Sequence, residues 1–400
     1  MRRIALVLLF LVPALAQEPP APVPPELKAR IEALEKLAGE APTEMAVLML
    51  LGNAYASAHE KDKAVAALQR IAESRCGLVP PADQELFLLK DDLGFQRALE
   101  ATRAASPIVK HATVAMRVKH PDLVPEGLAY DGGSGRFLLG GLYTRKILSV
   151  DKKGRARDFA AGEAIAGPLL GMKVQGGDLW AVTSWPDETH TPRSSVLRFD
   201  RRTGSLQAKY VPEDKDAALN DLTVSEAGDV FVSDSGPGGA VYRILRDAKT
   251  IEPFLPPGSI RYGNGIVVTR DGRSVFVGNW RGIWRIDADT RKFARLEHDA
   301  HLSASGIDGL YLHRGALVGI QNYTHPGRVV RWTMNPEQTR LVRQEVLESG
   351  NAALEEPTTG TIVGDTFYFI ANSQLRRMSD DAASLKRPVD PETVILKLPL

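Results

Sequence analysis

The spacing of hydrophobic positions divides the chain into two parts. Over residues 26–106 apolar side chains recur every three to four positions, and Leu27, Ile31 and Leu34 form one such stripe, which is typical of amphipathic helices. Over residues 112–400 the apolar residues come in short runs rich in Val, Ile and aromatic side chains, separated by Gly, Asp and Asn. Such runs are typical of strands and turns. The pattern predicts a mainly β protein, in which a small α-helical segment precedes a large β domain.

The β part repeats one unit at regular spacing. Asn220, Asn264 and Asp308 occupy matched positions 44 residues apart. Six copies of the unit begin near residues 125, 167, 219, 262, 306 and 356. A strand-rich repeat of about 40 to 50 residues is typical of propeller blades. We therefore expect a six-bladed β-propeller, whose ring is closed by pairing Thr113–Lys119 or Val394–Leu398 with the last blade, because an open ring would expose a strand edge.

The helical part contains one unit that is similar to a tetratricopeptide repeat, over residues 45–78. Leu48, Gly52, Tyr55 and Ala64 fall at the spacing of that repeat, in which small residues let two helices approach. A single unit cannot bury its own faces, so we expect it to pack on flanking helices or on the propeller. A groove for a protein partner and a helical spacer or cap are both compatible with it. The second is favoured, because peptide binding normally uses several stacked units.

The N-terminus has the pattern of an export signal. A basic start is followed by an apolar run of 13 residues over 4–16 that ends in Ala14-Leu15-Ala16, which predicts a signal peptide over residues 1–16. Residues 17–25, with five prolines, are expected to form an extended linker. The apolar run is shorter than the roughly 20 residues of a membrane span. The sequence predicts a periplasmic or secreted protein without stable membrane insertion, an N-terminal anchor being the alternative.

Charge and cysteine content narrow the partners and the source of stability. The 50 Lys and Arg residues balance 49 Asp and Glu residues, which argues against a nucleic-acid partner held by counterion release. Cys76 is the single cysteine, so no intramolecular disulfide can form. The fold is therefore expected to depend on packing, and on a metal if one is bound.

Polar side chains precede the first strand of four predicted blades: Glu126, Asn220, Asn264 and Asp308. The first strands are innermost in a propeller, so these side chains are expected to meet at one end of the central channel. Two carboxylates and two amides are hard oxygen ligands, which suit Ca²⁺, while Zn²⁺, Mg²⁺ and Mn²⁺ remain open. Taken singly, each residue is more simply explained as a turn former that caps its own backbone. Their recurrence at matched positions favours a metal site.

The four motifs that open these blades are PEG at 125–127, ND at 220–221, GNG at 263–265 and DGL at 308–310. Over residues 121–375 this run resembles the SMP-30/gluconolactonase/luciferin-regenerating-like family and, more distantly, the paraoxonases. The resemblance implies a six-bladed propeller with a divalent metal, commonly calcium, and lactonase or esterase activity. By motif position it assigns the metal ligands to Glu126, Asn220, Asn264 and Asp308. Sugar-lactonase members carry an arginine two positions before the ND asparagine, where this chain has Ala218.

The residues themselves support the same chemistry. A bound cation can polarise the carbonyl of a small lactone or ester, while a carboxylate activates the attacking water. Asp308 is the first choice of catalytic base, and His190 or His325 are the alternatives. Substrate contacts are predicted at Tyr143, Trp185, His190, Asp221, Trp280 and His325. His298 and His301 form an HxxH pair without a neighbouring Glu, and both are predicted to lie at the surface.

A different class of function also fits the sequence. The propeller could be a non-catalytic binding module that uses the metal only to order its channel, with the helical segment docking a protein partner. Both readings need the same four ligand candidates, so the ligands alone do not separate the two functions.

Overall fold

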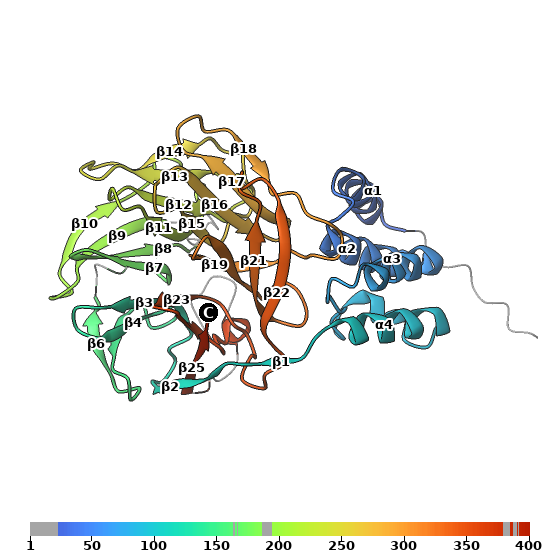
Figure 1. Cartoon of the computed structure of the whole chain (residues 1–400), viewed down its shortest axis with the longest axis horizontal. Coiled ribbons are helices and arrows are strands. Elements are labelled where there is room, and N and C mark those ends of the chain that lie inside the picture. Colours follow the sequence, from blue (N-terminus) through green and yellow to red (C-terminus); the bar gives the residue numbers. More distant parts are fainter. Residues whose placement is uncertain are drawn as a thin grey trace, which may run out of the picture.

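The computed structural model describes residues 23–400 except 163–164, 166, 186–193, 379–384, 387–389 and 391. The predicted signal peptide, most of the Pro-rich linker and His190 lie outside the described residues. Figure 1 shows a ring of sheets with a group of helices at one side of it. No helix among the described residues is long and apolar enough to cross a membrane.

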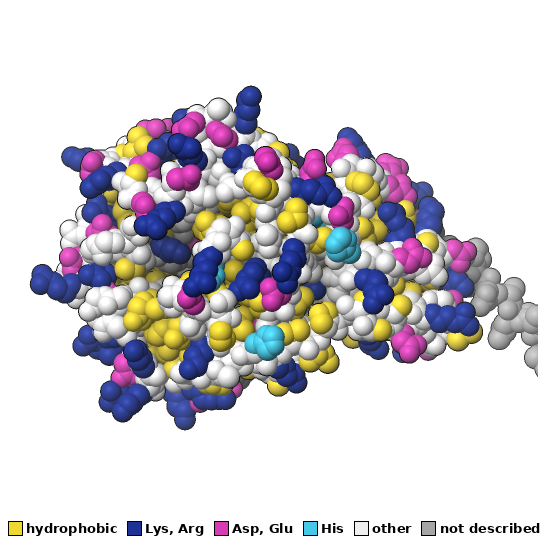
Figure 2. Space-filling model, in the orientation of Figure 1, with side chains coloured by type: hydrophobic (Ala, Val, Ile, Leu, Met, Phe, Trp, Pro, Cys, Tyr) yellow, Lys and Arg dark blue, Asp and Glu magenta, His cyan; other side chains and the backbone are white. Residues whose placement is uncertain are grey.

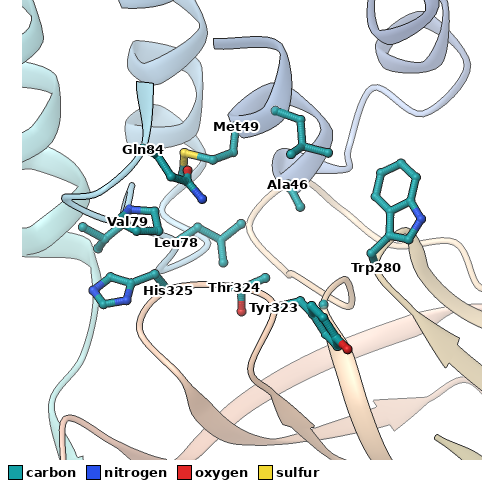
Figure 3. Close-up of a pocket in the computed structure, with 12 residues that line it drawn as sticks. Ala46, Met49, Leu78, Val79, Gln84, Trp280, Tyr323, Thr324 and His325 are labelled. Atoms are coloured by element: carbon teal, nitrogen blue, oxygen red, sulfur yellow. The ribbon is translucent and has the colours of Figure 1, made fainter. Parts of the chain in front are cut away.

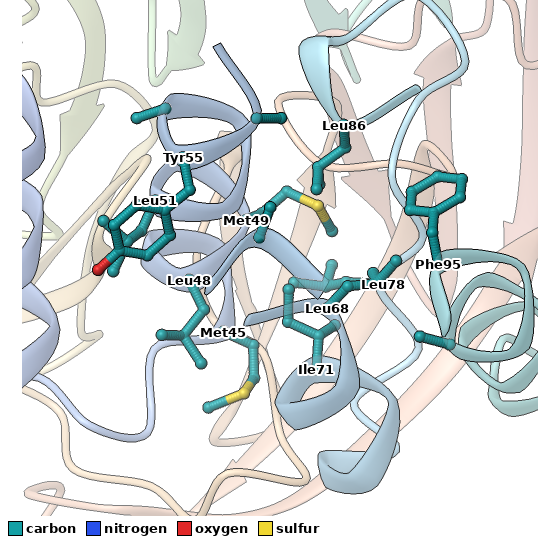
Figure 4. Packing of buried hydrophobic residues seen from close by; sticks show 14 of the residues in the cluster. Met45, Leu48, Met49, Leu51, Tyr55, Leu68, Ile71, Leu78, Leu86 and Phe95 are labelled. Atoms are coloured by element: carbon teal, nitrogen blue, oxygen red, sulfur yellow. The ribbon is translucent and has the colours of Figure 1, made fainter. Parts of the chain in front are cut away.

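The helical segment precedes the sheets and has its own core. It contains α1 (Pro25–Glu40), α2 (Met45–Ser57), α3 (Lys61–Ser74), the 3₁₀ helix η1 (Glu85–Leu89) and α4 (Leu93–Ala105). Pro25 suits the first position of α1 because its ring presets a helical φ. Asp92 is the N-cap of α4, and its carboxylate accepts hydrogen bonds from two backbone amides of the first turn. Met49, Leu68 and Phe95 lie in the apolar core that joins these helices (Figure 4).

Six antiparallel sheets follow in chain order around one axis. Blades 1 to 3 are β3–β6 (Pro125–Asp131, Arg136–Gly141, Ile147–Val150, Ala156–Ala160), β7–β10 (Leu169–Gln175, Asp178–Thr183, Ser195–Asp200, Leu206–Tyr210) and β11–β14 (Leu219–Val224, Val230–Asp234, Val241–Ile244, Glu252–Leu255). Blades 4 to 6 are β15–β18 (Ile266–Val268, Ser274–Asn279, Gly282–Asp287, Phe293–Arg295), β19–β22 (Ile307–His313, Ala316–Gln321, Arg328–Met334, Leu341–Ser349) and β23–β25 (Gly360–Val363, Thr366–Ile370, Glu392–Pro399). The prediction of a six-bladed propeller preceded by helices is confirmed.

The ring closes in two ways. Each innermost strand contacts the innermost strand of the next blade, and β23 returns to contact β3. The closing sheet has the order β2-β25-β24-β23, in which β2 (Thr113–Lys119) pairs with β25. Both strands considered from the sequence therefore take part in closure. A short strand, β1 (Val109–Lys110), adds to the outer edge of blade 5 and carries the chain from the helices to the propeller.

The helical segment is fixed to the propeller by buried polar contacts. Glu44 accepts a hydrogen bond from His298 Nε2 at 2.8 Å and lies 3.4 Å from Arg295. Both Glu44 and His298 are buried, so the prediction that His298 is a surface residue is wrong. Its partner lies 254 positions away in the chain, a contact that no local pattern could indicate. His301 is exposed, as expected.

A buried guanidinium forms a second attachment. Arg328 on β21 donates to the backbone carbonyls of Cys76 at 3.2 Å and Gly77 at 3.3 Å, and to the Gln321 side chain at 2.8 Å. Gly77 allows this approach, because a Cβ there would stand 2.7 Å from the Arg328 side chain. The helices are therefore held in one position against blades 4 and 5.

We expect the attachment through His298 to weaken as the pH rises. Burial lowers the pKa of His298 and Arg295 acts in the same direction, but the hydrogen bond to Glu44 and the charge of that carboxylate outweigh both and raise the pKa. A raised pKa means that the protonated ring stabilises the fold fully below its unfolded value of about 6.5, and that this stabilisation is lost as the pH rises through the folded value. Thermal unfolding of wild type and His298→Gln at about pH 6 and about pH 8 measures the effect.

The wild type should exceed His298→Gln in stability by more at the lower pH. His301→Gln, which changes an exposed ring of the same HxxH pair, should leave the pH dependence as it is in the wild type. An equal stability loss for His298→Gln at both pH values would show that the ring acts only as a neutral hydrogen-bond donor.

Candidate functional site

The same backbone irregularity recurs where the candidate ligands lie. In four blades the register between the first and second strands shifts by a bulge, between Pro125 and Leu128, Leu169 and Met172, Leu219 and Leu222, and Ile307 and Leu310. A bulge re-aims the side chains of the extra residue and its neighbours. Asn264 lies two residues before β15, whose pairing with β16 shows no such shift. Glu126, Asn220 and Asp308 each lie inside one of the bulges. The bulges therefore explain why these side chains leave the ordinary in-and-out alternation of a strand.

Glycines next to these residues bring the innermost strands together. A Cβ on Gly127 would overlap the backbone at Leu170 of the next blade, and one on Gly265 would overlap the backbone at Asp308. The glycines of the PEG and GNG motifs are thus required by close approach between blades. At Gly265 this approach brings Asn264 beside Asp308 of the next blade, whereas the residue that Gly127 approaches in blade 2 is the apolar Leu170.

Asp308 is buried, with 2% of its surface exposed. The Asn322 amide donates to its Oδ2 and also to the Pro357 carbonyl at 2.8 Å. Its Oδ1 has no hydrogen-bond partner among the described residues. Burial raises the pKa of Asp308 to about 7; the Asn322 and Asn264 amides act against this, and the charge of Asp221 adds to it.

Glu126 is the second buried carboxylate, with 5% of its surface exposed. Its Oε2 also lacks a hydrogen-bond partner among the described residues. Burial raises the pKa of Glu126 well above its ordinary value, and the charge of Asp308 raises it further. The two groups are therefore close enough to repel each other when both are ionised. The Thr359 hydroxyl donates to the Glu126 backbone carbonyl and fixes the main chain there.

The donor set fits a hard divalent cation. Each of the two buried carboxylates has an oxygen that no group in the described part of the chain satisfies, and such atoms are costly unless a proton, water or cation meets them. Among the described residues no three His, Cys, Asp or Glu side chains gather as a metal-binding group. Any site here would thus combine Glu126 and Asp308 with amide oxygens, a set better suited to Ca²⁺ than to Zn²⁺.

The two amide candidates open onto a cavity of about 520 Å³. Asn220 and Asn264 lie in its wall together with Ser235, Tyr262, Trp280, Ile307 and Tyr323. Asn220 donates to Ser235 Oγ at 3.3 Å. The volume lies within the range of about 300–1,000 Å³ typical of small-molecule sites. A small molecule in this cavity would meet both amides and the three aromatic side chains.

Three polar residues near the site were not predicted from the sequence. Asn322 holds Asp308, and the charge of Glu356 contributes to the raised pKa of both Glu126 and Asp308. Lys173 lies over the Tyr311 ring inside the channel. Burial lowers the pKa of Lys173, although the charge of Asp221 acts in the opposite direction. Glu356 is the first residue of the last copy of the repeat, and this position could have indicated that its side chain lies near the site. No comparable signal marks Lys173.

The residues predicted to contact substrate occupy different places. Trp280 lies in the wall of the 520 Å³ cavity, and His325 lines a neighbouring one. Tyr143 packs against a small apolar cluster, and the Trp185 ring lies against Gly167; neither is among the residues lining the two cavities. His190 lies outside the described residues.

Asp221 has a backbone role next to the site. Its carboxylate accepts from the amides of Leu222 at 2.8 Å and Ile266 at 3.3 Å, and so connects blade 3 to blade 4. Burial raises its pKa to about 6, although both amides and the charge of Lys173 lower it. It lines a narrow space in the channel with Lys173 and Tyr311.

Basic and acidic side chains are interspersed over the face of the molecule in Figure 2. That face carries no continuous basic band of the kind that holds a nucleic acid. The exposed charges therefore give no second candidate for a functional site on this side.

No protein-family profile and no curated protein sequence matches the chain. Solved structures do. A gluconolactonase from Xanthomonas campestris superposes with a TM-score of 0.50 at 14% identity, over 72% of this chain and 89% of its own. A putative gluconolactonase superposes with a TM-score of 0.50 at 14% sequence identity, over 73% of this chain and 93% of its own. A putative oxidoreductase (glucose dehydrogenase) from Thermus thermophilus superposes with a TM-score of 0.50 at 14% identity, over 72% of this chain and 99% of its own. At this identity the likeness shows that the chain shares the propeller fold of gluconolactonase-like proteins, a fold that also serves other chemistry.

Proposed function

We propose that this protein is a metal-dependent hydrolase that opens lactones or cleaves esters. The observation that carries the proposal is the pair of buried carboxylates, Glu126 and Asp308, each with an unsatisfied oxygen, near two amides that line a cavity of about 520 Å³. Gluconolactonases of the same fold support the reaction class by analogy. Ala218 stands where sugar-lactonase members carry a substrate-binding arginine, so we do not extend the proposal to sugar lactones.

Four side chains would hold the metal: Glu126, Asn220, Asn264 and Asp308. Ca²⁺ is the cation that this set favours. When bound, a divalent cation supplies Lewis-acid polarisation of a substrate carbonyl and offsets the negative charge that develops on its oxygen.

The remaining chemistry belongs to the protein. Asp308, fixed by the Asn322 amide, is placed to accept a proton from the attacking water. The charge of Asp308 raises the pKa of Tyr323, so its phenol stays protonated at neutral pH and can donate a hydrogen bond to substrate. Burial lowers the pKa of His325, which leaves a neutral imidazole as the second candidate base. The rings of Trp280 and Tyr323 would orient the substrate in the cavity.

A panel of lactones and aryl esters, assayed with and without chelator, tests the proposal. We expect turnover on at least one member, loss of that turnover on chelation, and its recovery on adding calcium. If no member is turned over while the protein still binds one equivalent of metal, the hydrolase proposal is wrong and the chain is a binding propeller. Turnover that is indifferent to the chelator would instead overturn the metal dependence.

A further inference from the structure

A cavity of about 250 Å³ lies between the helical segment and the propeller. Its helical wall is mainly apolar: it includes Ala46, Met49 and Leu50 of α2, and Leu78 and Val79 of the connection after α3, with Gln84 as its polar member (Figure 3). The three α2 residues are spaced i, i+3 and i+4, so they share one face of the helix. That face looks across the cavity at the propeller.

The opposite wall is formed by the loops after β16 and β20, which also border the candidate active site. Trp280 follows β16 and Tyr323 follows β20, and both residues also line the 520 Å³ cavity that contains Asn220 and Asn264. Tyr323 is exposed, with 68% of its surface accessible, and its hydroxyl points away from α2 (Figure 3). A molecule bound among the metal-ligand candidates can therefore extend past these two rings toward α2.

The helical wall is held in place against the loop that faces it. The Val79 amide donates to the His325 carbonyl at 2.8 Å. Glu44, two residues before Ala46, is tied to His298, and Arg328 holds the carbonyls of Cys76 and Gly77 just before Leu78. These attachments flank the apolar residues on both sides, so the cavity has fixed walls and is not a gap between loosely joined parts.

We propose that the helical segment forms the outer part of the substrate site, and that the 250 Å³ cavity binds the hydrocarbon chain of a lactone or ester. This inference rests on the proposed function, since it places the reacting carbonyl beside Glu126 and Asp308. An apolar cavity of about 150 Å³ accommodates benzene, so this one has room for a chain of several carbons. Its apolar walls favour an alkyl or acyl chain over a sugar.

Chain length provides the first test. In a series from γ-butyrolactone to γ-nonalactone, each methylene that enters the cavity should raise kcat/KM by about fourfold, because burying it contributes ~0.8 kcal/mol. The increase should stop when the cavity is full. A kcat/KM that does not change, or that falls, along the series would overturn the inference.

Two substitutions distinguish the cavity from general hydrophobic attraction. Ala46→Phe should fill the cavity from the α2 side and flatten the dependence of kcat/KM on chain length. Ala66→Phe adds the same ring at an exposed position of α3, outside the residues that line the cavity, and should keep the wild-type dependence. If both variants keep the wild-type dependence, the chain binds elsewhere.

A binding measurement separates this inference from the hydrolase proposal. Calorimetric titration with 1-octanol and 1-butanol, which are neutral and unreactive, reports on the cavity whether or not any lactone is hydrolysed. We expect 1-octanol to bind more tightly than 1-butanol, and Ala46→Phe to lose this difference. If the protein shows this pattern but turns over no lactone, the apolar site is supported and the hydrolase proposal is wrong. Equal binding of the two alcohols would refute the apolar site itself.

Discussion

Replacing Asp308 with Asn should lower kcat/KM for the best lactone or ester by about a thousandfold, in the middle of the range for losing a general base. The substitution keeps the shape of the side chain but removes the charge that would attract a cation and accept a proton. Asp308 is buried, and its Oδ1 has no hydrogen-bond partner among the described residues, so that oxygen is free to meet a cation or a water. Steady-state kinetics with saturating calcium measures the effect.

Asp289→Asn is the matched control, because Asp289 is exposed at a hairpin turn of blade 4 and should leave kcat/KM unchanged. Metal content should be measured in both variants. If Asp308→Asn binds the metal and retains turnover, Asp308 is not the base, and His325→Gln becomes the variant to compare. If metal and turnover are lost together, the carboxylate acts at least as a ligand.

The propeller could be predicted from the sequence because its blades repeat. Matched positions of Asn220, Asn264 and Asp308 along the chain become matched positions around an axis, whatever the loops between them do. The same logic predicts that these side chains meet. What the spacing does not reveal is the bulge that contains Asn220 and the one that contains Asp308, since a bulge depends on the pairing of two strands.

The sequence pattern does not predict which side chains of different segments contact each other. Asn322 reaches Asp308 through the antiparallel pairing of β20 with β19, which sets Gln321 opposite Ile307. The Glu44–His298 pair joins residues 254 positions apart. The repeat-like unit that contains Leu48 is expected to pack on flanking helices or on the propeller, and Leu48 lies in the core shared by the helices. Ala46 and Leu50 face the cavity as well, and only the docking of the helices on blades 4 and 5 shows this.

Calcium should stabilise the wild-type protein strongly, and Glu126→Gln should remove most of that effect. A ligand at a hundred times its dissociation constant stabilises a fold by about 2.7 kcal/mol, enough to raise Tm by several degrees. Glu126→Gln removes one of the two buried negative charges, so calcium binding should weaken and the shift in Tm should nearly vanish. Thermal unfolding in chelator and in excess calcium measures both parts.

In chelator, Glu126→Gln should change the stability in the opposite direction from its effect in calcium. Without a cation, Glu126 and Asp308 are buried carboxylates whose pKa values are raised by burial and, for Glu126, by the charge of Asp308, so ionising both at neutral pH costs stability. Glu126→Gln removes the cost of burying this ionisable carboxyl and should be more stable than wild type in chelator, although it is less stable in calcium. Glu213→Gln, at an exposed position, should change neither value. If calcium leaves the wild-type Tm unchanged and Glu126→Gln is destabilised in chelator, the carboxylates form an internal hydrogen-bonded pair and no cation joins them.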